Sequence, residues 1–135
     1  MKPKIKITDA HLKSSIDLLS ILLSDEMTLY VKTRKFHWNV AGESFMELHK
    51  LFEVQYTELE KIIDEVAERI NKLGGKTIGT MSEFIQHTRI KENPNNYPGQ
   101  KEMLSQLLDD HETLVGELRE DIDTCDETNK DAGSA

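Results

Sequence analysis

The chain has 135 residues, of which 25 are acidic and 17 are basic, so its formal charge is −8. This length predicts one domain, and the excess of negative charge disfavours a duplex DNA ligand and favours cations. The single cysteine, Cys125, excludes an internal disulfide framework. We expect a cytoplasmic protein, because no apolar leader or membrane-length apolar run is present.

Two long helices are expected in the first half of the chain. Apolar residues recur at three- and four-residue spacing from Asp9 to about Asn39, where Thr8 or Asp9 is placed to cap the helix. The Val40-Ala41-Gly42 segment breaks this pattern. The spacing resumes from about Ser44 to Leu73 and stops at Gly74-Gly75, a typical end of a helix.

The second half predicts a short helix from about Met81 to Arg89 and a longer one from about Gly99 to Thr124, separated by KENPNNYPG. No alternating β-branched run competes, so the pattern predicts a helical bundle. The chain stops at DETNKDAGSA without a fourth long helix. Since three long helices leave an apolar groove, we expect either that a neighbouring subunit covers it or that the chain is a truncated form.

Two histidines stand on either side of the break, and carboxylates follow the second one. With His49 taken as zero on the second helix, Glu53 lies at about 40°, Asp64 at about 60° and Glu68 at about 100°. These four side chains therefore share one side of the helix. His37 ends the first helix and can reach the same place, because the turn folds that helix back along the second.

One chain cannot bring all of these groups to one metal centre. Glu53 and Asp64 are separated by about 16 Å along the helix axis. An antiparallel copy of the helix, related by a two-fold axis near Glu58 and Leu59, would place His49 and Glu53 of one chain against the Asp64 end of the other. The spacing thus predicts two identical sites in each dimer.

Two imidazoles and three carboxylates without a thiolate suit iron, manganese or zinc. The large carboxylate share favours a redox-active or hard cation over structural zinc. The pairs His49/Glu53 and Asp64/Glu68 also have a simpler interpretation, in which they belong to a solvated helix face. Phe36 and Trp38 can likewise be simple core anchors. A structural helical module without metal therefore remains open from the residues alone.

The run FHWNVAGESFMELHKLFEVQYTELEKIIDEVAERINKLGG, which begins at Phe36, closely resembles the signature of the Dps family, the mini-ferritins. Weaker similarity extends over nearly the whole chain. Ordinary ferritin is a poorer match, because no histidine here has a glutamate three residues before it. Position 53 is glutamate where many members of the family have aspartate.

The resemblance implies an all-α, ferritin-like bundle of four helices. We expect a single Dps-type domain over residues 1–135 that departs from the family by being short at its C-terminus, without the fourth long helix. It implies a homo-oligomer, a hollow dodecamer built from two-fold dimers. It also implies an iron-storage ferroxidase that oxidises Fe(II) with hydrogen peroxide or dioxygen and protects against oxidative stress. Zinc or manganese would act as substitute metals.

The resemblance also assigns residues. The metal ligands are His37, His49 and Glu53 of one subunit with Asp64 and Glu68 of its partner, and Trp38 lies beside the site and intercepts oxidising equivalents. A non-enzymatic alternative is a shell that shields DNA. That alternative requires a basic tail, and the sequence offers only Lys2, Lys4 and Lys6.

Overall fold

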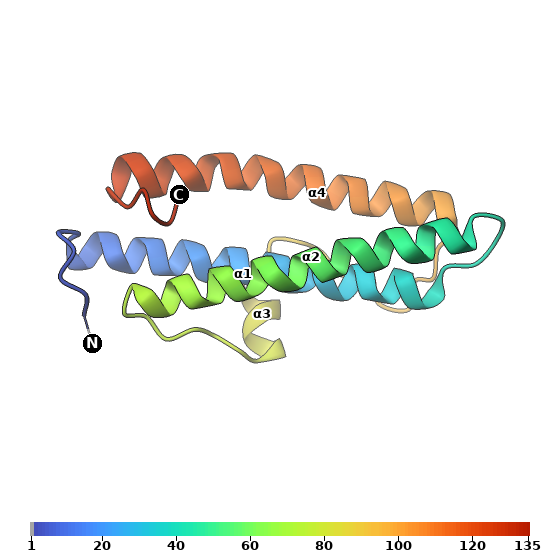
Figure 1. Cartoon of the computed structure of the whole chain (residues 1–135), viewed down its shortest axis with the longest axis horizontal. Coiled ribbons are helices and arrows are strands. Elements are labelled where there is room, and N and C mark those ends of the chain that lie inside the picture. The colour runs from blue at the N-terminus through green and yellow to red at the C-terminus, as the bar shows by residue number, and fades with distance from the viewer. Residues whose placement is uncertain (1) are drawn as a thin grey trace.

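The computed structural model describes residues 2–135, which form helices and no strand. The elements are α1 (Asp9–Asn39), α2 (Phe45–Lys72), α3 (Met81–His87), α4 (Gln100–Asp123) and a π-helical turn η1 (Thr124–Thr128). In Figure 1 the three long helices run lengthwise beside one another and the short α3 packs across the middle of the bundle. The all-α prediction is confirmed, and each helix begins and ends within two residues of its expected position.

The predicted helix boundaries have identifiable causes. The Thr8 side chain accepts a hydrogen bond from the main-chain nitrogen of His11 at 3.2 Å, which satisfies one of the free amides at the start of α1. At the end of α2, Gly74 has φ 87°, and the amide of Gly75 donates to the Ile70 oxygen at 3.1 Å. This is the Schellman arrangement, in which glycine takes the left-handed backbone position without a steric penalty.

Helix α1 is central, and it packs against α2, α3 and α4. Two apolar clusters fill the interior. The first joins α1 to α2 and α4 through buried residues that include Leu29, Phe36, Phe52, Met103 and Leu107. The second joins α1 to α2 and α3 through residues that include Leu12, Leu23, Ile70, Leu73 and Phe84.

The connection from α3 to α4 is fixed by a buried ion pair. Asp25 of α1 is fully buried, and it accepts hydrogen bonds from the amide of Arg89 at 2.6 Å and from its Nε atom at 2.8 Å. The same guanidinium binds Glu117 at 2.9 Å and Asp121 at 3.1 Å on α4. Arg89 therefore links α1 to α4, and Thr88 adds a further hydrogen bond to Asp25 at 3.1 Å.

The segment after α4 folds back onto the bundle. Asn129 is buried and donates to the hydroxyls of Ser14 at 3.0 Å and Ser15 at 3.1 Å on α1. Asp131 binds Arg69 of α2 at 2.9 Å. In Figure 1 the C-terminus lies near the same end of the bundle as the N-terminus. These contacts tie residues beyond η1 to both α1 and α2.

The expected apolar surface is present on α4. Four large side chains recur along one side of this helix and remain exposed: Leu104, Leu108, Val115 and Ile122. No helix within residues 2–135 has both the length and the apolar character needed to cross a bilayer.

Candidate metal centre

The two histidines on either side of the helix break are in direct contact. The turn between α1 and α2 brings the His37 and His49 rings to a centroid distance of 3.7 Å, with 15° between their planes. His37 is buried, with 8% of its surface exposed, and His49 is half-buried. The structure therefore places together the two imidazoles that the sequence separates by twelve positions.

Each imidazole is held by the other residue's main chain. The Nδ1 atom of His37 lies 2.7 Å from the carbonyl oxygen of His49, and the Nδ1 atom of His49 lies 2.8 Å from the carbonyl oxygen of His37. A carbonyl oxygen only accepts hydrogen bonds, so both Nδ1 atoms carry the proton and donate. The neutral form of each ring then keeps a lone pair on Nε2, the atom that is free to bind a metal.

The position of His37 in α1 explains half of this arrangement. The helix ends at Asn39, so the carbonyl of His37 belongs to the last turn and has no amide four residues later within the helix. His49 supplies the missing donor. One hydrogen bond thus pairs the free carbonyl group of His37 at the end of α1 and also orients the imidazole of His49.

The predicted carboxylates are accessible, and they do not converge within one chain. Glu53 follows His49 by one turn of α2, and Asp64 and Glu68 lie further along the same helix; all three are exposed. Within residues 2–135, no group of three or more histidine, cysteine, aspartate or glutamate side chains is close enough to hold a metal ion. One copy of the chain therefore brings His37 and His49 together and leaves Asp64 and Glu68 apart from them.

Aromatic rings surround the histidine pair. Phe45 stacks on His49 with centroids 5.0 Å apart, and Tyr56 contacts His37 edge-on at 5.2 Å. Phe36 is a buried core residue, as one interpretation of the sequence expected. Trp38 is not a core anchor, because 65% of its surface is exposed.

The sequence interpretation missed Arg34, which lies among Trp38 and two tyrosines. The signal was present, since Tyr30, Arg34 and Trp38 recur every four residues and thus lie on one side of α1. Tyr56 joins them from α2, and this contact across the two helices depends on how they pair.

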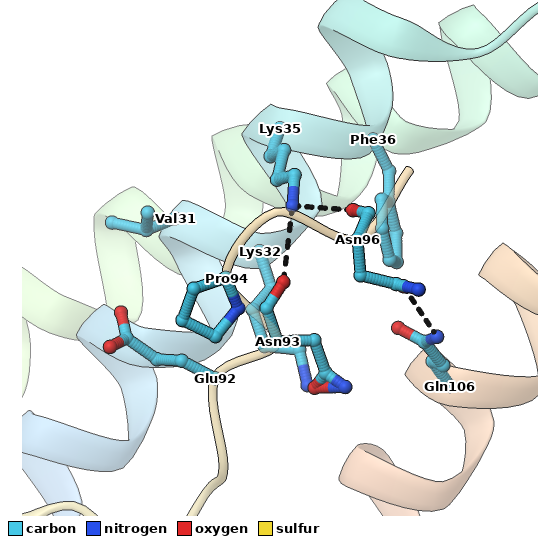
Figure 2. A pocket seen from close by; sticks show the side chains of 9 residues that line it. All are labelled: Val31, Lys32, Lys35, Phe36, Glu92, Asn93, Pro94, Asn96 and Gln106. Carbon is cyan, nitrogen blue, oxygen red and sulfur yellow. Dashed lines mark hydrogen bonds between the residues drawn. The ribbon is translucent and has the colours of Figure 1, made fainter. Parts of the chain in front are cut away.

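A separate cavity of about 310 Å³ lies between α1, the segment after α3, and α4 (Figure 2). Lys35 closes one side by donating to the carbonyl oxygens of Asn93 at 3.4 Å and Asn96 at 2.7 Å. Gln106 donates to the Asn96 side chain at 3.3 Å. These contacts fasten the connecting segment to the helices. None of the predicted metal ligands lines this cavity. The candidate metal centre is therefore not in this cavity but at the histidine pair.

Comparisons with known proteins identify the family. A model of the ferritin-like domain matches residues 16–135. The chain is 40% identical to an uncharacterized low temperature-induced protein of Nostoc sp. over 98% of this chain and 75% of that protein. It is 39% identical to the DNA protection during starvation protein of Brevibacillus brevis, over 90% of this chain and 84% of that protein.

A solved structure gives the same result. The Dps protein of Vibrio cholerae, described as a member of a broad superfamily of ferritin-like diiron-carboxylate proteins, superposes with a TM-score of 0.90. The match has 28% sequence identity and covers 98% of this chain and 82% of that chain. The fold, the matching domain model and the relatives agree, and the chain belongs to the Dps family of ferritin-like proteins.

Proposed function

We propose that this protein is an iron-storage ferroxidase whose site is shared by two copies of the chain. The ligands are His37, His49 and Glu53 from one copy, with Asp64 of the partner subunit and Glu68 of the partner subunit. The ferric product is retained by the assembled protein, which thereby protects against oxidative stress. Membership of a family that includes a ferritin-like diiron-carboxylate protein supports iron as the substrate.

The reciprocal histidine bonds carry this proposal. Metal-binding histidines usually donate their second ring N–H to a carbonyl or carboxylate, which fixes the tautomer and the direction of the ligand nitrogen. His37 and His49 both meet this requirement through Nδ1. The stacking of the rings, with centroids 3.7 Å apart and 15° between their planes, keeps the two imidazoles close together.

The donor set fits Fe(II). Imidazole and carboxylate ligands together suit iron and also admit zinc or manganese. A single copy supplies two nitrogens and the adjacent Glu53, too few ligands to neutralise a pair of divalent ions. The exposed Asp64 and Glu68 of the partner subunit, on the same side of an antiparallel α2, complete the set.

The chemistry follows from holding two Fe(II) ions close together. Each ion gives one electron, and one hydrogen peroxide takes two electrons and two protons to form two waters. Because the two electrons are delivered together, no hydroxyl radical is released. The protein's part is to bind and orient the ions, with the rings of His37 and His49 held in place by their Nδ1 hydrogen bonds.

The test is the rate of ferric absorbance after anaerobic Fe(II)-loaded protein is mixed with hydrogen peroxide. We expect His49→Ala to lose the fast phase and His87→Ala, which changes an exposed histidine on α3, to keep it. Circular dichroism checks that both variants retain their helices. A His49→Ala protein with the parent rate would refute the proposed site.

A further inference from the structure

Arg34 lies one turn before Trp38 on α1, with its guanidinium among three aromatic rings. Its Cζ atom is 4.2 Å from the ring centroid of Tyr56, 5.4 Å from that of Trp38 and 5.6 Å from that of Tyr30. The Nη1 atom also donates to the Tyr30 hydroxyl at 3.1 Å. These distances are within the range of cation–π attraction.

No carboxylate within residues 2–135 forms an ion pair with Arg34. The other two half-buried arginines behave differently, because Arg69 binds Asp131 and Arg89 binds Asp25. Arg34 therefore makes no direct ion pair within this range, and Glu60 is linked to it only through the Tyr30 hydroxyl, which donates to the Glu60 Oε1 atom at 3.4 Å. The guanidinium instead contacts the rings of Tyr30, Trp38 and Tyr56 and the hydroxyl oxygen of Tyr30.

This group of rings adjoins the histidine pair. Tyr56, the ring nearest to Arg34, contacts His37 at 5.2 Å, and it meets Tyr30 edge-on at 6.1 Å. Trp38 directly follows His37 in the chain. An oxidant that reacts at the histidines is therefore close to side chains that are themselves oxidisable.

We propose that Arg34 is a positioning residue whose charge makes Trp38 harder to oxidise. A neutral ring attracts the cation through its negative face. When the Trp38 indole gives one electron to an oxidant, it becomes a radical cation, and the same guanidinium then repels it. Arg34 therefore stabilises the reduced ring and destabilises the oxidised one.

The consequence for iron chemistry rests on the function proposed above. With Arg34 in place, peroxide takes its electrons from Fe(II), while the rings beside the site stay reduced. The charge at position 34 thus lowers the rate at which Trp38 acts as a reserve electron donor.

The experiment uses Trp38 as its own reporter, because it is the only tryptophan. Iron-free protein is treated with hexachloroiridate(IV), a one-electron oxidant, at high salt, which screens long-range attraction of the reagent. The initial rate of tryptophan fluorescence loss is measured for the parent, Arg34→Gln, Arg34→Met and Arg34→Lys. Arg119→Gln, which removes an exposed arginine of α4, is the matched control.

We expect Arg34→Gln and Arg34→Met to accelerate the loss roughly two- to fivefold, the factor that corresponds to a cation–π attraction of about 0.5–1 kcal/mol. Arg34→Lys and Arg119→Gln should keep the parent rate, because a cation remains in the first and no ring contact is lost in the second. An unchanged rate in both neutral variants, with native circular dichroism, would overturn the role of Arg34.

A second arm separates this inference from the proposed function. The same proteins are given Fe(II) and hydrogen peroxide, and oxidation of Trp38 is measured by mass spectrometry. More Trp38 oxidation in Arg34→Gln than in the parent supports the shielding role during turnover, and equal oxidation contradicts it. If the parent oxidises no iron, the proposed function fails, and the iridium experiment still decides the role of Arg34.

Discussion

Asp25 and Glu26 are neighbours in α1, and both are buried, but only Asp25 has a cationic partner. Asp25 is bound by Arg89 at 2.7 Å. Glu26 is 5% exposed, and its Oε2 atom has no hydrogen-bond partner. Burial, together with repulsion from Asp25, raises the pKa of Glu26 to about 7. We therefore expect that loss of the cation beside Asp25 destabilises the fold, whereas removal of the acidic group of Glu26 stabilises it.

Removal of Arg89 should be strongly destabilising. Arg89→Ala leaves the fully buried Asp25 without its cation, and breaking one side of such a pair costs about 3–5 kcal/mol. Urea denaturation followed by circular dichroism measures the free energy of unfolding. Lys13→Ala is the control, because the Lys13–Asp17 pair is exposed on the same helix and contributes under about 1 kcal/mol. Equal losses in the two variants would contradict a structural role for Arg89.

Glu26→Gln should stabilise the protein at neutral pH. In the unfolded chain this carboxyl ionises near its ordinary pKa of 4.5, whereas in the folded chain it stays protonated up to about pH 7. The folded state therefore holds one more proton in this window. Stability from this group is greatest below pH 4.5, falls as the pH rises to about 7, and stays low above that.

The amide of Gln does not titrate, so the difference between variant and parent should grow with pH. We expect almost no difference near pH 4.5 and a gain of roughly 3 kcal/mol above pH 7, from the size of the shift. Urea denaturation at several pH values measures it. Glu112→Gln, an exposed change on α4, should show no such trend. A pH-independent difference for Glu26→Gln would mean that Glu26 is ionised in the folded protein.

The shared site predicts recovery of activity when two inactive variants are mixed. His37→Ala and Asp64→Ala each damage both sites of their own dimer, and both should lose fast iron oxidation while keeping their helices. In a mixed dimer, one site carries both lesions and the other carries none. Stopped-flow mixing after denaturation and reassembly should therefore recover up to about one quarter of the parent activity, since half of the dimers are mixed and each has one intact site. Verified subunit exchange without recovery would count against the two-fold arrangement.

The sequence predicted helix positions well because their determinants are local. Thr8 caps α1 and Gly74 ends α2 through contacts made within a few residues. The meeting of His37 and His49 was also predictable, since one short turn separates the two helices. The periodicity also placed Glu53, Asp64 and Glu68 on one side of α2, although no contact within one chain tests their role as ligands.

Other features depend on contacts that no local pattern encodes. Arg89 reaches Asp25 across 64 positions of the chain, and Asn129 reaches Ser15 across 114. The exposure of Trp38 follows from how α1 and α2 pair, and an isolated tryptophan in a sequence is equally compatible with the core. Tertiary packing, and not helix propensity, decides each of these.

The exposed apolar stripe of α4 predicts self-association. Leu108 is 57% exposed and Val115 is 52% exposed, and they lie on the same side of the helix as Leu104 and Ile122. A contiguous apolar surface is rarely left open to water on a soluble monomer. We expect light scattering to give a mass well above the 15.5 kDa of one chain and larger than a dimer.

The double variant Leu108→Gln/Val115→Gln should reduce this mass toward the dimer, because the proposed two-fold contact lies on α2 and does not use α4. Leu51→Gln, which changes an exposed leucine on α2, is the comparison, and it should leave assembly through α4 intact. Helix content is measured alongside to separate loss of contact from loss of fold. A parent protein that is fully helical, monomeric and unable to bind Co(II) or Fe(II) would contradict both the α4 interface and the shared metal centre.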